Sequence, residues 1–484
     1  MQNLYSSAQS LQMDRISQTD FSIPGETLME NASRSAYMLI REQIASCSKA
    51  VFAAGCGNNG GDALAMARMA FSDGLKNICI LKADGPKETP LREKQRLAAQ
   101  KLGIPFTDCL EGADLIIDGL LGVGLRGQAR EPYAALIRKI NAHSASTGCR
   151  VISLDVPSGL GDSAPSGNTA DCIAVRSDMT ICMGELKSAL YIPGNRELAG
   201  SIVKTVPLFP EGAKPEPQTV LLEESDMHIA PLRSGSYKKS RGSIAIIGGS
   251  GRFTGAVILA AMAAFHSGAG LVTVFTEKQL LPIVCRAVPS AMVTTYEDLS
   301  DLSGFDCVLV GPGMGKNHDG ALEKALAQAR RIVVDADGIR AFCRRKARAR
   351  GNCILTPHPG EFEALRKAYC PDIAADTPES FHDALALCVE ATGAVIAYKA
   401  DTLWIQGNGG TFAVDGSNPS LGVAGSGDVL AGITAALAAR SADGDMEKTA
   451  CSAVLLHQKA GRLAKEDLGF YPSSELVKYI GRAI

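Results

Sequence analysis

The sequence predicts an α/β protein of two domains, and three observations support this. At 484 residues the chain is longer than one ordinary domain. Short apolar runs alternate with helix-period stretches in both halves, as in βαβ units with parallel sheets. Each half also has a glycine-rich loop that leads into a helix, at residues 55–62 and 418–428. The start of a helix offers free amide groups and a favourable dipole to an anion, so we expect two sites for nucleotide-like substrates.

In the N-terminal half, five apolar runs predict strands, and the segments between them predict helices. The strands are expected at residues 50–54, 78–81, 115–118, 151–155 and 179–183, and the helices include 61–72, 87–102 and 132–142. A parallel sheet built this way is covered by helices on both faces. We therefore expect an N-terminal domain, residues 1–210, with a Rossmann-like three-layer α/β/α structure.

The segment 207–218 interrupts this alternation with four prolines and a glycine, and it predicts a linker. A second domain is then expected at residues 220–484. Its strands are predicted at residues 243–247, 271–275, 307–310, 332–335, 353–355, 395–398 and 402–405. The apolar stretch 255–275 contains His266 and Gly268, so we expect a buried helix followed by a strand there rather than a membrane span.

Composition excludes several classes of function. The 49 basic and 51 acidic side chains nearly balance, which gives no general attraction to nucleic acid or to a membrane. None of the 14 cysteines has C-x-x-C spacing, so we expect reduced, mostly buried thiols rather than a zinc or disulfide framework. The first 20 residues lack the basic and apolar regions of an export signal. These features predict a cytoplasmic protein that binds neither nucleic acid nor membrane.

Polar loops follow three of the predicted N-terminal strands, at residues 55–62, 118–126 and 155–159. Ligands of a parallel sheet bind at the carboxyl ends of its strands. Asn59, Asp118 and Ser158 offer oxygen ligands for a hard cation, and Arg126 suits a diphosphate. Any one of these loops could be a tight turn with capping side chains. Three at successive strand ends favour a binding site.

Together with the segment 17–34, which includes Ile23-Pro24-Gly25-Glu26-Thr27-Leu28-Met29-Glu30-Asn31, these loops resemble the NAD(P)H-hydrate epimerase family over residues 1–206. The resemblance implies a potassium ion held by Asn59, Asp118 and Ser158. It also implies that the substrate contacts Asp155 and two loops: Asn58, Asn59, Gly60, Gly61 and Asp62, and Gly122, Val123, Gly124, Leu125, Arg126, Gly127 and Gln128. Ala63 is a departure, since a glycine is usual there.

The implied reaction accounts for an acidic group and a basic group in this half. A hydrated nicotinamide carries a hydroxyl on a carbon bonded to the ring nitrogen. Inverting that carbon needs a proton donor and a proton acceptor, while the nitrogen lone pair assists loss and return of the oxygen. Asp155 is the candidate for one role and Lys187 for the other. A surface or structural lysine is the alternative interpretation of Lys187.

In the C-terminal half, the amide-lined loop Gly425-Ser426-Gly427 leads directly into Asp428. Transfer of a phosphoryl group to a hydroxyl needs this combination of donors and a base. Further motifs lie at residues 248–256, 311–315, 335–338 and 356–361. In this order the set resembles the ADP-dependent NAD(P)H-hydrate dehydratase family, whose fold is ribokinase-like, over about residues 237–464.

This second resemblance implies two groups of contacts. The hydrate is expected at Ala256, Gly313, His358 and Asp428. The adenine nucleotide is expected at Lys399, Ala400, Asp401 and Thr402, and at Asn418, Pro419, Ser420, Leu421, Gly422, Val423, Ala424, Gly425, Ser426 and Gly427. Mg²⁺ is expected to accompany it, with Asp335 or Asp337 in its outer shell. The 399–402 segment is one residue shorter than is usual in that family, and Ala424 stands where a glycine pair is usual.

Asp428 is expected to deprotonate the hydroxyl of the hydrate while the terminal phosphoryl group of ADP is transferred to it. Phosphate then leaves far more readily than hydroxide. The prediction is a homo-oligomeric repair enzyme with two activities: it epimerises the R and S hydrates of NADH and NADPH (NADHX and NADPHX), and it dehydrates the S hydrate with formation of AMP and phosphate.

Two alternatives stay open at this point. One is a ribokinase-like kinase for a vitamin or sugar alcohol, which would not need the fused N-terminal domain. The other makes the N-terminal domain a non-catalytic binding module, which would not need Asn59, Asp118, Asp155 and Ser158 together.

Overall fold

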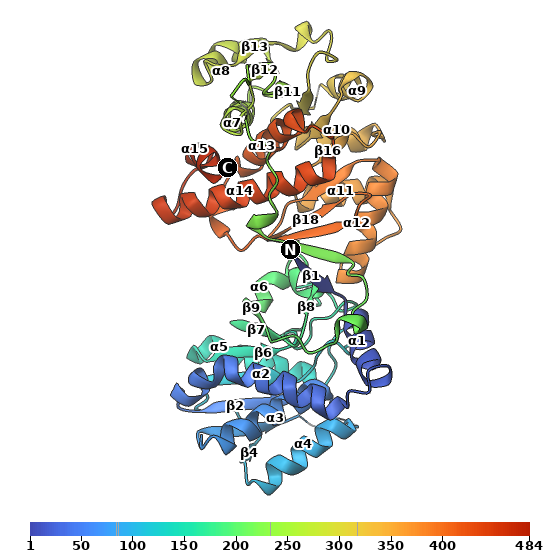
Figure 1. Cartoon of the computed structure of the whole chain (residues 1–484). Coiled ribbons are helices and arrows are strands. Elements are labelled where there is room, and N and C mark those ends of the chain that lie inside the picture. The colour runs from blue at the N-terminus through green and yellow to red at the C-terminus, as the bar shows by residue number, and fades with distance from the viewer. Residues whose placement is uncertain (84, 86, 233, 317) are drawn as a thin grey trace. The chain divides into compact units, whose positions relative to one another are not determined.

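The computed structural model describes residues 1–83, 85, 87–232, 234–316 and 318–484 (Figure 1). The chain divides into two compact units, each with its own core. The N-terminal unit comprises Asn3–Thr219 and Ala375–Phe381, and the C-terminal unit comprises Met1–Gln2, Val220–Ala374 and His382–Ile484. The segment Ala375–Phe381 is held within the N-terminal unit by backbone hydrogen bonds, from the Ser166 amide to the Asp376 carbonyl (2.8 Å) and from the Glu379 amide to the Asp162 carbonyl (2.9 Å). The two-domain α/β prediction is confirmed.

The N-terminal unit is built around a parallel sheet in the order β4-β3-β2-β5-β6-β7-β9. β1 also pairs with β8 in parallel. The elements are β1 (Gln2–Tyr5), α1 (Ser7–Thr19), α2 (Gly25–Ser46), β2 (Ala50–Ala54), α3 (Asn58–Ser72), β3 (Ile78–Lys82), α4 (Pro90–Lys101), β4 (Phe106–Thr107), β5 (Leu115–Gly119), α5 (Tyr133–Thr147), β6 (Arg150–Leu154), β7 (Met179–Cys182), β8 (Leu186–Lys187), α6 (Asn195–Ala199) and β9 (Ser201–Lys204), with 3₁₀ helices at Ser188–Tyr191 and Glu211–Ala213.

The central strand β2 shows why this unit has three layers. Its five residues are all fully buried, and successive side chains point to opposite faces of the sheet. Ala50, Phe52 and Ala54 pack in one apolar cluster with residues of α2 and α3, whereas Val51 and Ala53 pack in another with residues of α5. Helices thus cover both faces, and the expected α/β/α layering is confirmed.

The C-terminal unit contains a larger sheet with the order β13-β12-β11-β14-β15-β16-β17-β18-β19-β10. Its elements are β10 (Thr219–Leu222), β11 (Ser243–Ile247), α7 (Thr254–His266), β12 (Leu271–Thr276), α8 (Leu281–Ala287), β13 (Met292–Thr295), β14 (Cys307–Val310), α9 (Asp319–Gln328), β15 (Ile332–Val334), α10 (Asp337–Arg344), β16 (Cys353–Leu355), α11 (Pro359–Tyr369), α12 (Pro378–Thr392), β17 (Val395–Tyr398), β18 (Thr402–Gln406), β19 (Thr411–Asp415), α13 (Ser426–Arg440), α14 (Met446–Leu468) and α15 (Ser473–Ala483), with 3₁₀ helices at Glu224–Asp226, Lys278–Leu280, Tyr296–Asp298 and Pro419–Leu421.

Most of this sheet is parallel, but β18 runs antiparallel to both of its neighbours, β17 and β19. Only residues 399–401 connect β17 to β18, and so short a connection makes a hairpin rather than a helical crossover. On one face, α7, α13, α14 and α15 pack into a single apolar cluster, while α9–α12 are drawn on the other side of the sheet (Figure 1).

The prediction for the stretch 255–275 is confirmed. The stretch 255–275 forms the buried helix α7 and the strand β12, and no helix in the described part of the chain is long and apolar enough to cross a membrane. All 14 cysteines are free, and most are buried. Among the described residues, no group of three or more His, Cys, Asp or Glu side chains is arranged to hold a metal ion.

Two strand ends differ from the prediction at positions that matter for the sites. Asp155 and Asp335 are expected as the last residues of strands, but β6 ends at Leu154 and β15 at Val334. Asp155 has a φ of 67°, and Ala336, directly after Asp335, has a φ of 50°. Residues other than glycine rarely adopt this left-handed conformation, and it tends to occur where function requires it. In both units the strained residue lies at the edge of the sheet where ligands bind.

Candidate active sites

In the N-terminal unit, the glycine-rich loop packs tightly upon itself before α3 begins. A Cβ atom on Gly60 would lie 1.9 Å from the carbonyl oxygen of Gly55, so only glycine fits there. Gly57 precedes the helix, and no described side chain caps this N-terminus. The first amides of α3 are therefore available to an anionic group.

The three expected cation ligands meet around the loop that follows β5. The carbonyl oxygen of Leu121 accepts hydrogen bonds from Asn59 Nδ2 (2.9 Å) and from Ser158 Oγ (3.1 Å). Ser158 Oγ also donates to Asp118 Oδ1 (2.6 Å), and the Ser158 amide donates to Asp118 Oδ2 (2.9 Å). Asn59, Asp118 and Ser158 are thus brought together, as the resemblance implies.

Two features show that this cluster fits a cation. Asn59 Oδ1 is buried and has no hydrogen-bond partner among the described residues. Asp118 is completely buried, and burial raises the pKa of its carboxyl although hydrogen bonds from Ser158 and Ser153 oppose the shift. A buried oxygen without a donor and a buried carboxylate are both stabilised by a positive ion. Amide, carboxylate and hydroxyl oxygens are ligands that a hard cation prefers.

Asp155 and Lys187 form a buried ion pair between Asp155 Oδ1 and Lys187 Nζ. The Lys187 amine also donates to the Met183 carbonyl (2.8 Å), and only 3% of the residue is exposed. The alternative of a surface lysine is therefore excluded. The sequence could not show this contact, because β8 reaches Asp155 only through the folding of the unit.

Asp62 lies in the same region. Burial raises the pKa of its carboxyl to about 8; the hydrogen bond from Ser33 Oγ (2.9 Å) opposes this shift, and the negative charge of Asp155 adds to it. Asp62 is thus largely protonated at neutral pH. Ser33 was not among the predicted site residues, although it lies in the segment 17–34 that contributes to the resemblance.

Only the start of the predicted loop 122–128 lies near Asn59, Asp118 and Ser158. A Cβ atom on Gly122 would lie 3.2 Å from Asn59 Cβ, which places the start of the loop beside Asn59. Arg126 and Gln128 are exposed, and the Gln128 side chain donates to the Asp171 carbonyl. The far end of the loop therefore faces solvent.

In the C-terminal unit, Asp428 lies in the first turn of α13, directly after the glycine-rich loop. Gly425 has a φ of 90° at the start of this helix. Burial raises the pKa of the Asp428 carboxyl to about 7; Asp335 and Glu361 add to the shift, and Lys399 opposes it. A carboxyl with a pKa near neutrality is well suited to exchange protons with a substrate.

Lys399 lies against the glycine-rich loop. Its Nζ is 2.6 Å from Asp335 Oδ1, and a Cβ atom on Gly427 would lie 3.2 Å from the same Nζ. The ammonium group therefore lies against the backbone that is expected to hold phosphate. Thr356 Oγ1 donates to the same oxygen of Asp335 (2.8 Å) and helps to fix the pair.

The other predicted hydrate contacts lie on neighbouring loops. Gly313 has a φ of 59°, and a Cβ atom on it would lie 3.1 Å from Ala256 Cβ. His358 is the N-cap of α11: its Nδ1 accepts from the Gly360 amide (3.0 Å), and its Nε2 lies 3.2 Å from Glu361 Oε1. Half of the His358 side chain is exposed and available to a ligand. The buried Glu361 was not among the predicted site residues.

The predicted nucleotide segments differ in exposure. Asp401 and Ala424 are exposed, whereas Thr402 is completely buried. Asn418 is also buried, and both its Oδ1 and its Nδ2 lack a hydrogen-bond partner among the described residues. Beneath the loop, Ser426 Oγ lies 3.1 Å from Nε2 of His457, a buried residue of α14 that no sequence signal marked.

The fold and these two clusters define an α/β enzyme with two sites, each with a buried carboxylate near a glycine-rich helix N-terminus. Comparison with known proteins agrees. Residues 244–482 match the family model of NAD(P)H-hydrate dehydratase, and residues 25–189 match the model of the YjeF-related protein N-terminus.

Relatives match over nearly the whole chain. A protein of Coxiella burnetii is 31% identical over 481 residues, covering 96% of each chain, and one of Escherichia coli K12 is 30% identical over 423 residues, covering 85% of this chain and 80% of its own. Both are named bifunctional NAD(P)H-hydrate repair enzyme. A solved ribokinase-like protein of Enterococcus faecalis is 25% identical with a TM-score of 0.50, covering 55% of this chain and 95% of its own. The chain belongs to the family of bifunctional NAD(P)H-hydrate repair enzymes.

Proposed function

We propose that this chain repairs hydrated nicotinamide nucleotides in two steps. The N-terminal unit interconverts the R and S hydrates of NADH and NADPH. The C-terminal unit converts the S hydrate and ADP into NAD(P)H, AMP and phosphate. Membership of the repair family supports both activities, and the observation that carries the proposal is the carboxyl of Asp428, poised near neutral pKa beside an amide-lined loop.

For the epimerase step, the Asp155–Lys187 pair supplies a proton acceptor and a proton donor side by side. The carboxylate accepts the proton of one group on the hydrate while the ammonium donates to another. The ring nitrogen lone pair assists loss of the oxygen, which returns on the opposite face. The protonated Asp62 provides a further hydrogen-bond donor at this site.

K⁺ is the cation that the family resemblance implies, and Asn59, Asp118 and Ser158 would hold it. Its positive charge, when bound, would fix the loops around Leu121 and attract a diphosphate. Epimerisation should slow when K⁺ is replaced by a large organic cation such as tetramethylammonium, and Asn59→Ala should remove this dependence. Equal rates in both salts would contradict the assignment.

For the dehydratase step, Asp428 removes the proton of the hydrate hydroxyl. The oxygen then bonds to the terminal phosphorus of ADP as the bond from that phosphorus to AMP breaks. Lys399 and the amides of residues 425–427 stabilise the charge on the phosphoryl oxygens. Phosphate leaves with the C–O bonding pair, the ring nitrogen supplies electrons, and loss of a ring proton restores the reduced nicotinamide.

Nucleotide binding in this unit is proposed at Lys399–Thr402 and Asn418–Gly427. The unpaired amide atoms of Asn418 would gain partners from the nucleotide. Mg²⁺, when bound, would neutralise charge on its phosphates. Asp335 accepts hydrogen bonds from Lys399 and Thr356, and Asp337 accepts one from the Gly315 amide (2.9 Å). These carboxylates therefore suit the outer coordination shell of Mg²⁺ better than direct ligation.

The test mixes purified protein with racemic NADH hydrate and ADP and follows recovery of the reduced nicotinamide together with release of AMP and phosphate. Complete consumption of both epimers is expected. Asp155→Asn should leave one epimer behind, and Asp428→Asn should abolish recovery while epimerisation continues. Phosphorylation of a vitamin or sugar alcohol without action on the hydrate would replace this proposal with the kinase alternative.

A further inference from the structure

The glycine-rich loop of the N-terminal unit is held by hydrogen bonds from two other helices. Arg92 Nε of α4 donates to the Gly55 carbonyl (3.0 Å), and the Thr89 amide, at the N-cap of the same helix, donates to the Cys56 carbonyl (3.0 Å). The Cys56 amide donates to the hydroxyl of Tyr133, the first residue of α5 (3.0 Å). The two residues that lead from β2 toward α3 are thus fixed from both α4 and α5.

Gly55 also lies against the loop that follows β5, where the three expected cation ligands meet. Its amide donates to the Gly119 carbonyl (3.1 Å), and a Cβ atom on Gly55 would lie 1.8 Å from the Leu120 carbonyl oxygen. The next carbonyl, that of Leu121, accepts a hydrogen bond from the Asn59 side chain. A displacement of Gly55 would therefore disturb the backbone that orients Asn59, together with the first amides of α3.

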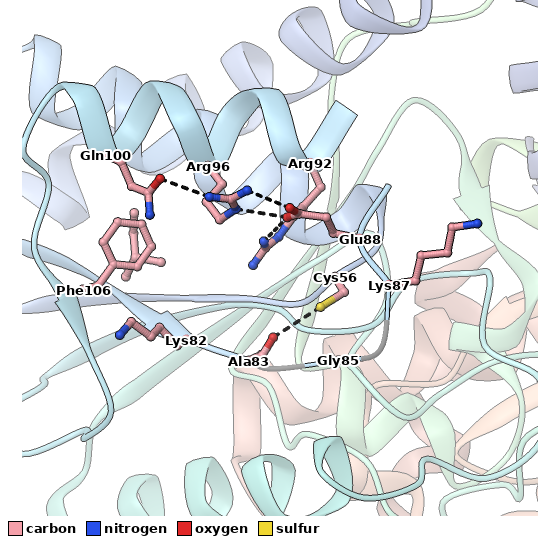
Figure 2. Close-up of a pocket in the computed structure, with 11 residues that line it drawn as sticks. Cys56, Lys82, Ala83, Gly85, Lys87, Glu88, Arg92, Arg96, Gln100 and Phe106 are labelled. Carbon is pink, nitrogen blue, oxygen red and sulfur yellow. Dashed lines mark hydrogen bonds and ion pairs between the residues drawn. The ribbon is translucent and has the colours of Figure 1, made fainter. Parts of the chain in front are cut away.

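Arg92 is buried in spite of its charge, since only 9% of the residue is exposed. A buried cation needs a partner, and Glu88, just before α4, supplies one. Its carboxylate pairs with Arg92 and with Arg96 (2.8 Å), and Figure 2 shows it facing both guanidinium groups. The hydrogen bond from Arg96 contributes most to lowering the pKa of Glu88 to about 2, so this partner stays ionised.

The simpler interpretation is that Arg92 only stabilises α4. Opposite charges four residues apart contribute little to a helix, however, and they can do so on its exposed face. Arg92 differs because its Nε reaches the backbone of another element, where a charged donor makes a strong hydrogen bond. Arg96 shares Glu88 but otherwise bonds within α4, to Gln100 (3.0 Å). Among the described residues, no hydrogen bond joins Arg96 to the glycine-rich loop. Arg92 therefore has a contact that helix stability does not require.

We infer that Arg92 and Tyr133 are positioning residues of the epimerase site. They hold the backbone of residues 55–56 so that the first amides of α3 and the side chain of Asn59 keep the orientation in which they meet the substrate and the cation. Donors that are oriented before the substrate arrives need no rearrangement during the reaction. Glu88 orients the guanidinium group of Arg92, and the two positioning residues act through the loop without touching the hydrate. This inference rests on the proposed epimerase function.

The test uses the full chain with Asp428→Asn as the parent, so that only interconversion of the hydrates is measured. Separated epimers of NADH hydrate are supplied, and the approach to the mixture is followed by chromatography. Arg92→Met keeps the length of the side chain but loses its donors, and kcat/KM should fall about 10²-fold, as expected when bound groups are misplaced by about 1 Å. Arg92→Lys keeps a charged donor and should recover most of this loss. Tyr133→Phe removes only the hydroxyl and should lower kcat/KM about fivefold.

Arg96→Met is the matched control, because Arg96 lies on the same helix, pairs with the same carboxylate and lines the same cavity of about 430 Å³ as Arg92. It should keep the kinetics of the parent chain. An equal loss in Arg96→Met and Arg92→Met would show that positive charge in the cavity matters rather than the loop, and would overturn the inference. Unchanged kcat/KM in both Arg92→Met and Tyr133→Phe would overturn it as well.

A second measurement does not depend on turnover. Hydrogen exchange of the Gly55 and Cys56 amides is followed in the chain without ligand, because both amides are hydrogen-bonded in the loop. Arg92→Met and Tyr133→Phe should speed this exchange at least about tenfold, and Arg96→Met should not. Faster exchange throughout the N-terminal unit with kcat/KM unchanged would make Arg92 a residue of general stability and would contradict the inference. If the parent chain interconverted neither epimer, the epimerase function would be wrong instead, and the exchange rates would still decide whether these side chains hold the loop.

Discussion

Both candidate sites bury a carboxylate at a sheet edge, but only one of the two carboxylates is paired directly with a lysine. In the N-terminal unit, Asp155 is paired directly with Lys187. In the C-terminal unit, the nearby lysine, Lys399, is paired with Asp335, and Asp428 has no ion-pair partner among the described residues. Burial therefore raises the pKa of Asp428 to about 7. The comparison shows that two buried carboxylates at similar sheet edges differ in whether a lysine is paired with them directly.

The largest effect should come from removing the unpaired carboxylate. Asp428→Asn deletes the base for phosphoryl transfer, and we expect ADP-dependent recovery of NADH to fall by about 10³-fold or more. Interconversion of the epimers should stay within twofold of the wild type. Asp467→Asn, an exposed carboxylate paired with Arg482, is the control. Recovery at a tenth of the normal rate or better would show that another group is the base.

Breaking the Asp155–Lys187 ion pair tests the site of the N-terminal unit, where the buried carboxylate is paired with a lysine. Lys187→Met leaves the Asp155 carboxylate buried without an opposite charge, so we expect a loss of about 3 kcal/mol in the free energy of unfolding, together with loss of epimerisation. The double variant Asp155→Asn/Lys187→Met removes both charges and should regain most of the stability but none of the activity. Denaturant unfolding and epimer chromatography measure the two effects. If the double variant epimerised, the pair would be only structural.

The rate of dehydration should depend on pH through the ionisation of Asp428. Asp428 acts as a base only when ionised, so dehydration should fall about tenfold for each pH unit below about 7 and level off above it. Glu361→Gln removes a negative charge that raises this pKa, and should move the midpoint of the kcat/KM profile to lower pH. The kcat/KM profiles of Glu361→Gln and of the wild type, recorded on the S hydrate, give the direction of the shift. An unchanged midpoint would show that the charge of Glu361 does not affect the pKa of Asp428.

The smallest effect is expected at Asn418, whose buried amide atoms lack partners in the described structure. If the nucleotide supplies them, Asn418→Ala should raise KM for ADP about tenfold with little change in kcat. The stability of the protein without nucleotide should stay equal or increase, because an unsatisfied polar group is removed. Thermal unfolding with and without ADP distinguishes the two effects. A lower stability without ADP, with KM unchanged, would make Asn418 a structural residue.

Much of the fold could be predicted because its signals are local. Runs such as Ala50–Ala54 and Ser243–Ile247 form strands with the predicted limits, since an apolar run between turn residues needs no distant partner to be recognised. The antiparallel pairing of β17 with β18 and the helix α1 were not foreseen. The predicted strand ends at Asp155 and Asp335 were wrong by one residue, because the left-handed turns there depend on tertiary packing.

The site residues differ in the same way: those that depend on local backbone shape could be predicted, and those that depend on contacts between distant segments could not. Glycine-rich loops and the polar residues after strands are visible in the sequence, because helix N-termini and strand ends need particular local backbone shapes. The roles of Asn59, Asp118 and Ser158 as ligands stay predictions, though the structure brings the three together. Ser33 and Glu361 were missed, because their contacts join segments that no local pattern relates.

The sequence by itself determined two α/β domains, two glycine-rich anion loops and the positions of their carboxylates, because hydrophobic periodicity and glycine placement act over a few residues. Only the tertiary structure decided that Lys187 neutralises Asp155, that Lys399 neutralises Asp335 instead of Asp428, and that Asp62 keeps its proton. The energy of a charge depends on its burial and on partners within a few ångströms, and the folding of distant segments sets both.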